Sequence, residues 1–211
     1  MKKDLTEIIC VIDKSGSMAP RTQDVIGGYN RFLEDQKKEK GGALLTLALF
    51  DTDYKIIDYG IDISMAKGLT EHVYQAGGMT ALLDAVGRTI DKVGDRLAAT
   101  NEKKRPGKVI FLIITDGEEN SSREYTLDRV KGKIKSQQET FKWEFVFLGA
   151  NQDAFASAMS MGIPGAQAVN FRPTAQGVQA AYANMSHTVS GYRDSGKVDM
   201  SKFKADEEEA P

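Results

Sequence analysis

Short apolar runs of strand length alternate along the chain with segments whose apolar residues recur at helical spacing. Strands are predicted over residues 8–12, 43–50, 54–63, 108–115, 142–148 and 166–171. Helices are predicted over residues 20–40, 80–99, 126–138, 153–161 and 174–192. Strands that alternate with helices are typical of a mostly parallel sheet covered by helices on both faces.

Two of the predicted strands refine this picture. Residues 108–115 carry the most hydrophobic run of the chain, which is typical of a central strand buried on both faces. The turn Asp51-Thr52-Asp53 joins two strand patterns and predicts an antiparallel hairpin, which makes residues 54–63 an antiparallel edge strand. The expected fold is therefore a doubly wound α/β domain over residues 1–193, followed by an acidic C-terminal tail over residues 194–211 that we expect to be disordered.

Composition and charge narrow the possible partners. The net charge of −2 over 211 residues provides no strong basic field for nucleic acid or an anionic membrane. The longest apolar stretches have the length of strands and are too short to span a bilayer. Cys10 is the only cysteine, which suits a reducing compartment. We therefore expect a cytoplasmic protein that binds neither nucleic acid nor membrane.

Oxygen-bearing side chains gather where the predicted strands end. Asp13, Ser15 and Ser17 follow the first strand at every second position, and Asp116 follows the strand over residues 108–115. Thr80 stands at the start of the strongly predicted helix 80–99, after two glycines. Because the carboxyl ends of parallel strands meet at one edge of a sheet, we expect these side chains to converge there.

The predicted cluster contains carboxylates and hydroxyls, with no thiol or imidazole beside them. Such hard oxygen donors suit Mg²⁺ best and Mn²⁺ or Ca²⁺ next, and they suit zinc poorly. Only Asp13 and Asp116 would contribute charge, and at least one coordination position would remain for water or an incoming oxygen. An acidic side chain of a partner protein is the natural extra ligand. A polar cluster without metal is the alternative, and we favour the metal site.

These residues resemble the metal-ion-dependent adhesion site (MIDAS) of von Willebrand factor type A (vWA) domains. The pattern Asp13-x-Ser15-x-Ser17 with Thr80 and Asp116 fills every position of that motif. The segments Ile-Asp-Lys-Ser-Gly-Ser-Met and Ile-Ile-Thr-Asp-Gly-Glu-Glu-Asn are similar to those of bacterial and phage members.

The resemblance implies a doubly wound, Rossmann-like domain with a metal at its upper edge. It implies that Ser15 and Ser17 bind the metal directly, that Asp13 acts through water, and that Thr80 and Asp116 exchange direct and water-mediated roles. It also implies binding of a protein partner through a carboxylate that bridges to the metal. Cytoplasmic members of the family often occur beside AAA-type ATPases, in stress resistance or in phage-related systems.

Three functions compete at this stage. The leading hypothesis is a metal-dependent protein-binding module without enzymatic activity. The second is a Mg²⁺-dependent phosphatase or phosphotransferase with Asp13 as nucleophile, but the acid/base Asp that such enzymes need two residues later is replaced by Ser15. The third is a subunit of a larger assembly in which the metal only stabilises the fold.

Residues beside the motif allow further interpretations. Glu118, Glu119 and Asn120 could form an outer shell of the site, although a solvated loop is favoured. Asp51 and Asp53 could bind a second cation, but turn formation explains both residues more simply.

Overall fold

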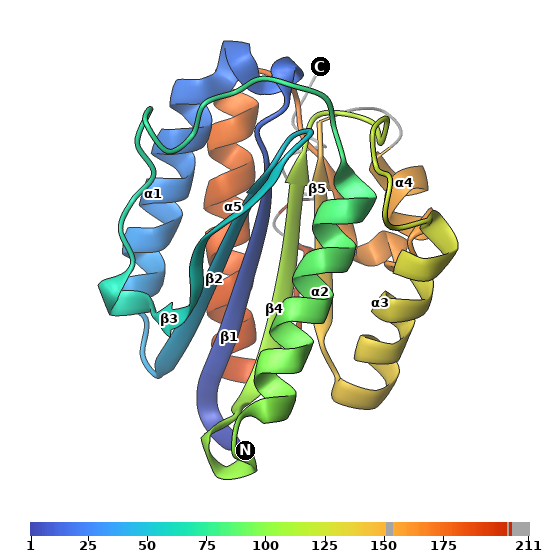
Figure 1. Cartoon of the computed structure of the whole chain (residues 1–211). Helices are drawn as coiled ribbons and strands as arrows, with labels where there is room; N and C mark the ends of the chain where they lie inside the picture. Colours follow the sequence, from blue (N-terminus) through green and yellow to red (C-terminus); the bar gives the residue numbers. More distant parts are fainter. Residues whose placement is uncertain (151–153, 202, 204–211) are drawn as a thin grey trace.

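The structure is a computed structural model that describes residues 1–150, 154–201 and 203. Its centre is a six-stranded sheet with the order β3-β2-β1-β4-β5-β6 (Figure 1). The strands are β1 (Lys2–Asp13), β2 (Gly42–Phe50), β3 (Tyr54–Asp62), β4 (Pro106–Thr115), β5 (Glu144–Gly149) and β6 (Ala168–Asn170). The helices are α1 (Thr22–Lys38), α2 (Leu82–Ala99), α3 (Leu127–Phe141), α4 (Ala154–Ser160) and α5 (Ala175–Ser195).

All neighbouring strands of the sheet pair in parallel except β2 and β3, which form the predicted antiparallel hairpin. The prediction of a mostly parallel sheet with one antiparallel edge strand is confirmed. The most apolar strand, β4, lies in the middle of the sheet and pairs with β1, so that Ile12 is opposite Ile114. This register places the chain that leaves β1 next to the chain that leaves β4.

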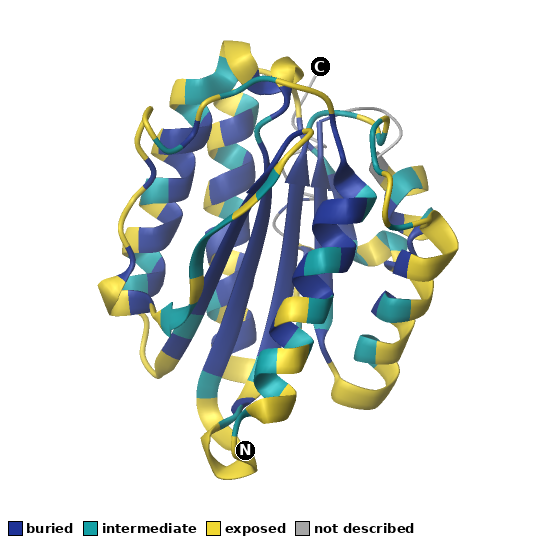
Figure 2. Ribbon diagram, viewed as in Figure 1, coloured by how far each residue is buried: buried dark blue, intermediate teal, exposed yellow. Residues whose placement is uncertain are grey.

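Two apolar layers lie on opposite faces of the sheet. The inner strands β1, β2, β4 and β5 are mostly buried between them, whereas the residues of the edge strand β3 are exposed or partly exposed (Figure 2). Along β1, Ile8, Cys10 and Ile12 face the layer formed with α1 and α5. Ile9 and Val11 face the layer formed with α2 and α3. This alternation follows from the period of two in a strand, and it explains why the whole of the run 8–12 is apolar.

Helix α1 packs closely on α5 at a glycine. A Cβ atom added to Gly28 would lie 2.5 Å from Cδ2 of Tyr182, whereas a Cβ atom on Gly27 would meet nothing within 4 Å. The glycine pair lowers the helix propensity of α1, but Gly28 allows the ring of Tyr182 to lie against the helix backbone.

The C-terminal part is more closely packed than the sequence predicts. The expected domain boundary at residue 193 falls inside α5, and Met200 and Phe203 beyond the helix are buried in the layer beside α5. Both side chains belong to the apolar layer that the sheet forms with α1 and α5. Residues 204–211 of the expected acidic tail lie outside the described residues.

Among the helices of the described residues, none combines the length and apolarity needed to cross a bilayer.

Candidate metal centre

The predicted site residues come from three segments that meet at the carboxyl end of the sheet. Asp13 is the last residue of β1, and Asp116 directly follows β4. Ser15 and Ser17 lie where the chain leaves β1 for the 3-10 turn Gly16–Arg21, and Thr80 precedes α2. In Figure 1 this edge is at the top, where the arrowhead of β4 points.

The two serine hydroxyls and the carboxylate of Asp116 form one cluster of oxygen atoms. Oγ of Ser15 lies 3.1 Å from Oγ of Ser17, and the hydroxyl of Ser17 donates to Oδ1 of Asp116 at 2.5 Å. Neighbouring ligand oxygens of an octahedral Mg²⁺ site lie about 2.9 Å apart, since each is about 2.1 Å from the ion. The spacing of these oxygens therefore fits a small divalent cation. Ser15 is buried and Ser17 is exposed, so the cluster reaches the solvent.

Asp13 is fully buried beneath this cluster, and its two carboxylate oxygens are both used. Oδ1 accepts a hydrogen bond from the backbone N–H of Ser15 at 2.7 Å, and Oδ2 accepts one from the hydroxyl of Thr115 at 2.6 Å. Burial raises the pKa of Asp13 to about 6, against the lowering effect of these hydrogen bonds and with a small contribution from the charge of Asp116. A cation nearby would offset the cost of this buried charge.

Thr80 is held at the site by paired backbone and side-chain contacts with Asn120. The N–H of Asn120 donates to the carbonyl of Thr80 at 3.0 Å, and the N–H of Thr80 donates to Oδ1 of Asn120 at 2.9 Å. A Cβ atom added to Gly117 would lie 2.9 Å from Oγ1 of Thr80 and 3.5 Å from Oγ of Ser17. The two hydroxyls thus flank one point, and a side chain at Gly117 would fill the space between them.

The loop before α2 is fixed against the loop after β1. The N–H of Gly77 donates to the carbonyl of Lys14 at 2.8 Å, and the N–H of Gly16 donates to the carbonyl of Gly78 at 3.1 Å. Gly78 has a φ of 71°, a conformation that favours glycine. These contacts bring Thr80 beside the serines.

The Asp51-Thr52-Asp53 segment is a turn, as its composition indicates. Oδ1 of Asp51 accepts from the N–H of Asp53 at 2.6 Å, and Oδ2 of Asp51 forms an ion pair with Lys14. The hydrogen bond from the N–H of Asp53 to the side chain of Asp51 closes a turn, and this contact supports the turn interpretation.

The segment after Asp116 is more than the solvated loop favoured by the sequence. Glu119 accepts hydrogen bonds from the N–H groups of Leu83 at 2.8 Å, Ser121 at 2.9 Å and Ser122 at 2.7 Å. Glu118 alone of the acidic pair is exposed. Glu119 therefore fastens this loop to the start of α2, because the unpaired N–H groups of a helix start need an acceptor. Asn120 fastens the same loop through its contacts with Thr80.

Arg21 is a further residue of the site that no sequence pattern indicates. Its Nη1 atom donates to Oδ2 of Asp116 at 2.5 Å and to the carbonyl of Ser17 at 2.9 Å, and its Nε atom donates to the carbonyl of Pro173 at 2.9 Å. Arg21 ends a turn that follows the motif, and no sequence spacing links it to Asp116 or to the loop before α5. Only the tertiary structure reveals the contact.

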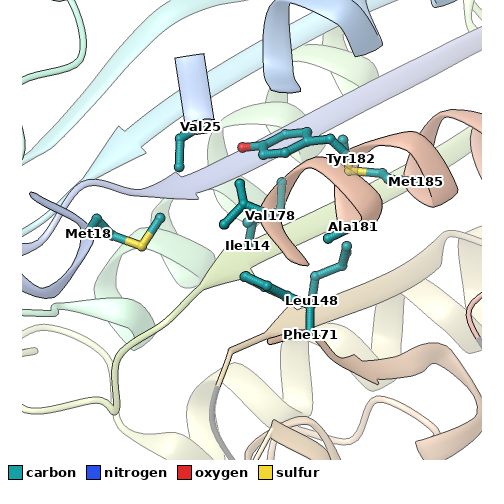
Figure 3. A pocket seen from close by; sticks show the side chains of 9 residues that line it. All are labelled: Met18, Val25, Ile114, Leu148, Phe171, Val178, Ala181, Tyr182 and Met185. Carbon is teal, nitrogen blue, oxygen red and sulfur yellow. The ribbon is translucent and has the colours of Figure 1, made fainter. Parts of the chain in front are cut away.

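Met18 belongs to the core rather than to the rim of the site. Its side chain is 1% exposed and points into a small apolar cavity below the turn, between the sheet and α5 (Figure 3). The cavity is lined by Met18, Val25, Ile114, Leu148, Phe171, Val178, Ala181, Tyr182 and Met185. Met18 therefore anchors the serine loop to the core and is not available to touch a ligand.

Within the described residues, no group of three or more His, Cys, Asp or Glu side chains is placed to hold a metal ion. The predicted site contains only Asp13 and Asp116 as carboxylates, so any metal held there depends on the hydroxyl groups as well.

No family model and no curated protein matches this chain. Solved structures do. One is proximal thread matrix protein 1 (PTMP1) from the mussel byssus, in a structure with a zinc-occupied MIDAS motif. It matches with a TM-score of 0.64 and 12% identity, and the match covers 86% of this chain and 47% of the PTMP1 chain. The vWF domain of the type V pili tip protein Mfa5 from Porphyromonas gingivalis matches with a TM-score of 0.57 and 12% identity over 94% of this chain and 99% of its own.

The von Willebrand factor type A protein from Catenulispora acidiphila matches with a TM-score of 0.57 and 14% identity over 90% of this chain and 44% of its own. The chain has the vWA fold. It spans slightly less than half the length of the byssus protein, which matches over 46% or 47% of its own chain. At these identities the vWA likeness establishes the architecture alone.

Proposed function

We propose that this chain is a divalent-metal-dependent protein-binding module. Mg²⁺ held by Asp13, Ser15, Ser17, Thr80 and Asp116 would coordinate an acidic residue of a partner protein. The observation that carries the proposal is the hydrogen bond from Ser17 to Asp116, two residues 99 positions apart, with the hydroxyl of Ser15 next to them. The zinc-occupied MIDAS of PTMP1 supports divalent metal binding on this fold.

The contacts of each site residue suggest its role in metal binding. Ser15, Ser17 and Asp116 present oxygens at one point, whereas Asp13 holds the serine loop through the N–H of Ser15. The metal, when bound, supplies positive charge and an open position for an anionic oxygen. The two carboxylates balance the charge of a divalent cation, and a further carboxylate would bind at the open coordination position.

The contacts of Asp13 disfavour the phosphotransferase alternative. A nucleophilic carboxylate needs an oxygen that can reach the substrate. Asp13 is 0% exposed, and its two oxygens accept hydrogen bonds from Ser15 and Thr115. It is placed to support the site from below, and we therefore propose binding without catalysis.

The resemblance of the motif to bacterial and phage vWA members supports a finer proposal. We infer a cytoplasmic setting, in which an AAA-type ATPase or a stress- or phage-related complex supplies the acidic partner.

The test measures metal binding and partner binding separately. Saturating Mg²⁺ should stabilise the wild type by about 2.7 kcal/mol at a hundredfold excess over its dissociation constant. The double variant Ser15→Ala/Ser17→Ala should lose this gain, while Ser136→Ala, which changes an exposed serine of α3, should keep it. Affinity capture from the native host should recover a partner with Mg²⁺ and lose it with EDTA or with the double variant.

Other outcomes identify the alternatives. A partner that is retained in EDTA by a protein still stabilised by Mg²⁺ would indicate a purely structural metal. Phosphatase turnover that disappears in Asp13→Asn would indicate the enzyme. Failure of Mg²⁺ to stabilise the wild type would refute the metal site itself.

A further inference from the structure

Arg21 forms an ion pair with one of the carboxylate oxygens of the proposed metal site. Its guanidinium contacts Oδ2 of Asp116, whose side chain is only 4% exposed, and it is itself 19% exposed. The same group is held by the carbonyl oxygens of Ser17 and Pro173. Three acceptors from separate segments thus fix a permanent positive charge against a proposed metal ligand.

This contact changes the charge of the site. Asp13 and Asp116 are the only carboxylates among the proposed ligands, and Arg21 neutralises one of them. The nearby cation Lys14 is paired with Asp51 instead. Among the ion pairs of the described residues, that of Arg21 is the one that includes a proposed ligand.

We propose that Arg21 sets the metal affinity of the site, because its guanidinium competes with the divalent cation for the carboxylate of Asp116. This inference rests on the proposed metal site and adds a residue that the motif does not contain. A guanidinium cannot lose its charge at physiological pH, so the competition is always present. Metal binding in the wild type is therefore weaker than it would be without Arg21.

A purely structural role for Arg21 predicts the opposite effect. If the guanidinium only orients Asp116 and ties it to the loop before α5, its removal loosens a ligand and weakens metal binding. Competition predicts tighter binding, because one positive charge is removed and an oxygen of Asp116 is released. The sign of the change distinguishes the two roles.

The experiment is a titration of the metal-free full chain with Mn²⁺, in which free Mn²⁺ is followed by electron paramagnetic resonance. Arg21→Gln should bind Mn²⁺ on the order of tenfold more tightly than the wild type. Arg21→Lys keeps the charge but loses the planar fork that spans three acceptors, so its affinity should lie between the two. Arg31→Gln, an exposed position on α1 away from the site, removes the same charge and should leave the affinity within about twofold.

Thermal unfolding in EDTA shows which variants fold, and Arg21→Lys tests the sign of the effect if Arg21→Gln does not fold. Unchanged or weaker Mn²⁺ binding in the folded Arg21 variants overturns this inference and leaves the proposed function intact. If neither the wild type nor Arg21→Gln binds Mn²⁺, the proposed function fails instead.

Discussion

Asp13 should destabilise the metal-free protein, and replacing it by asparagine should make that protein more stable. The carboxylate is fully buried, and burial raises its pKa from 3.8 to about 6. Asparagine has nearly the same shape. Its oxygen can accept from the N–H of Ser15, and its amide can donate to the hydroxyl of Thr115, which can turn to the carbonyl of Gly117 at 3.1 Å.

The direction and size of the effect follow from proton linkage. Because the folded-state pKa of Asp13 lies above the unfolded value, the folded protein binds this proton more tightly. The stability due to the proton is complete below about pH 4 and is lost as the pH rises through about 6. Above both values the ionised carboxylate costs about 3 kcal/mol, since each pKa unit corresponds to about 1.4 kcal/mol.

The assay is urea unfolding in excess EDTA at about pH 5 and about pH 8. Asp13→Asn should raise the free energy of unfolding by up to about 3 kcal/mol at the higher pH and by less at the lower pH. Asp95→Asn, an exposed position of α2, should change it by less than about 0.5 kcal/mol. Excess Mg²⁺ should then stabilise the wild type more than Asp13→Asn. If Asp13→Asn is no more stable than the wild type in EDTA at the higher pH, the account of a buried carboxylate whose charge its hydrogen bonds only partly offset is wrong.

Two further predictions concern packing and a buried ion pair. Gly28→Ala should lower the free energy of unfolding in urea by about 1–3 kcal/mol, because its Cβ atom would lie 2.5 Å from the ring of Tyr182. The control Gly27→Ala should leave this free energy unchanged or raise it by up to about 1 kcal/mol. Equal effects of the two substitutions would contradict the packing of α1 on α5. Arg96→Met leaves the fully buried Glu7, now paired with Arg96 at 2.5 Å, without its cation and should cost about 3–5 kcal/mol. Burial already raises the pKa of Glu7, so the loss measured by urea unfolding should be greater at high than at low pH, and a loss independent of pH would argue against this role.

The hydrophobic pattern was sufficient to predict the sheet. The unbroken apolar run of β4 can only be buried on both sides, and the Asp51-Thr52-Asp53 turn is too short for anything but a hairpin, so the central strand and the antiparallel edge both follow from local sequence. Bounds were less well predicted. β1 begins at Lys2 rather than at residue 8, because its pairing with β2 starts at Leu5 and its pairing with β4 reaches back to Lys2.

The motif residues could be named in advance because their spacing and their positions after strands are local properties of the chain, and parallel strands share one edge. What the sequence could not supply was their surroundings. The contact of Arg21 with Asp116, the hydrogen bond from Thr115 to Asp13 and the clamp of Asn120 on Thr80 join positions that no periodicity relates. Such contacts depend on how loops from different strands are packed together, and it is these contacts that determine the charge and the proposed metal affinity of the site.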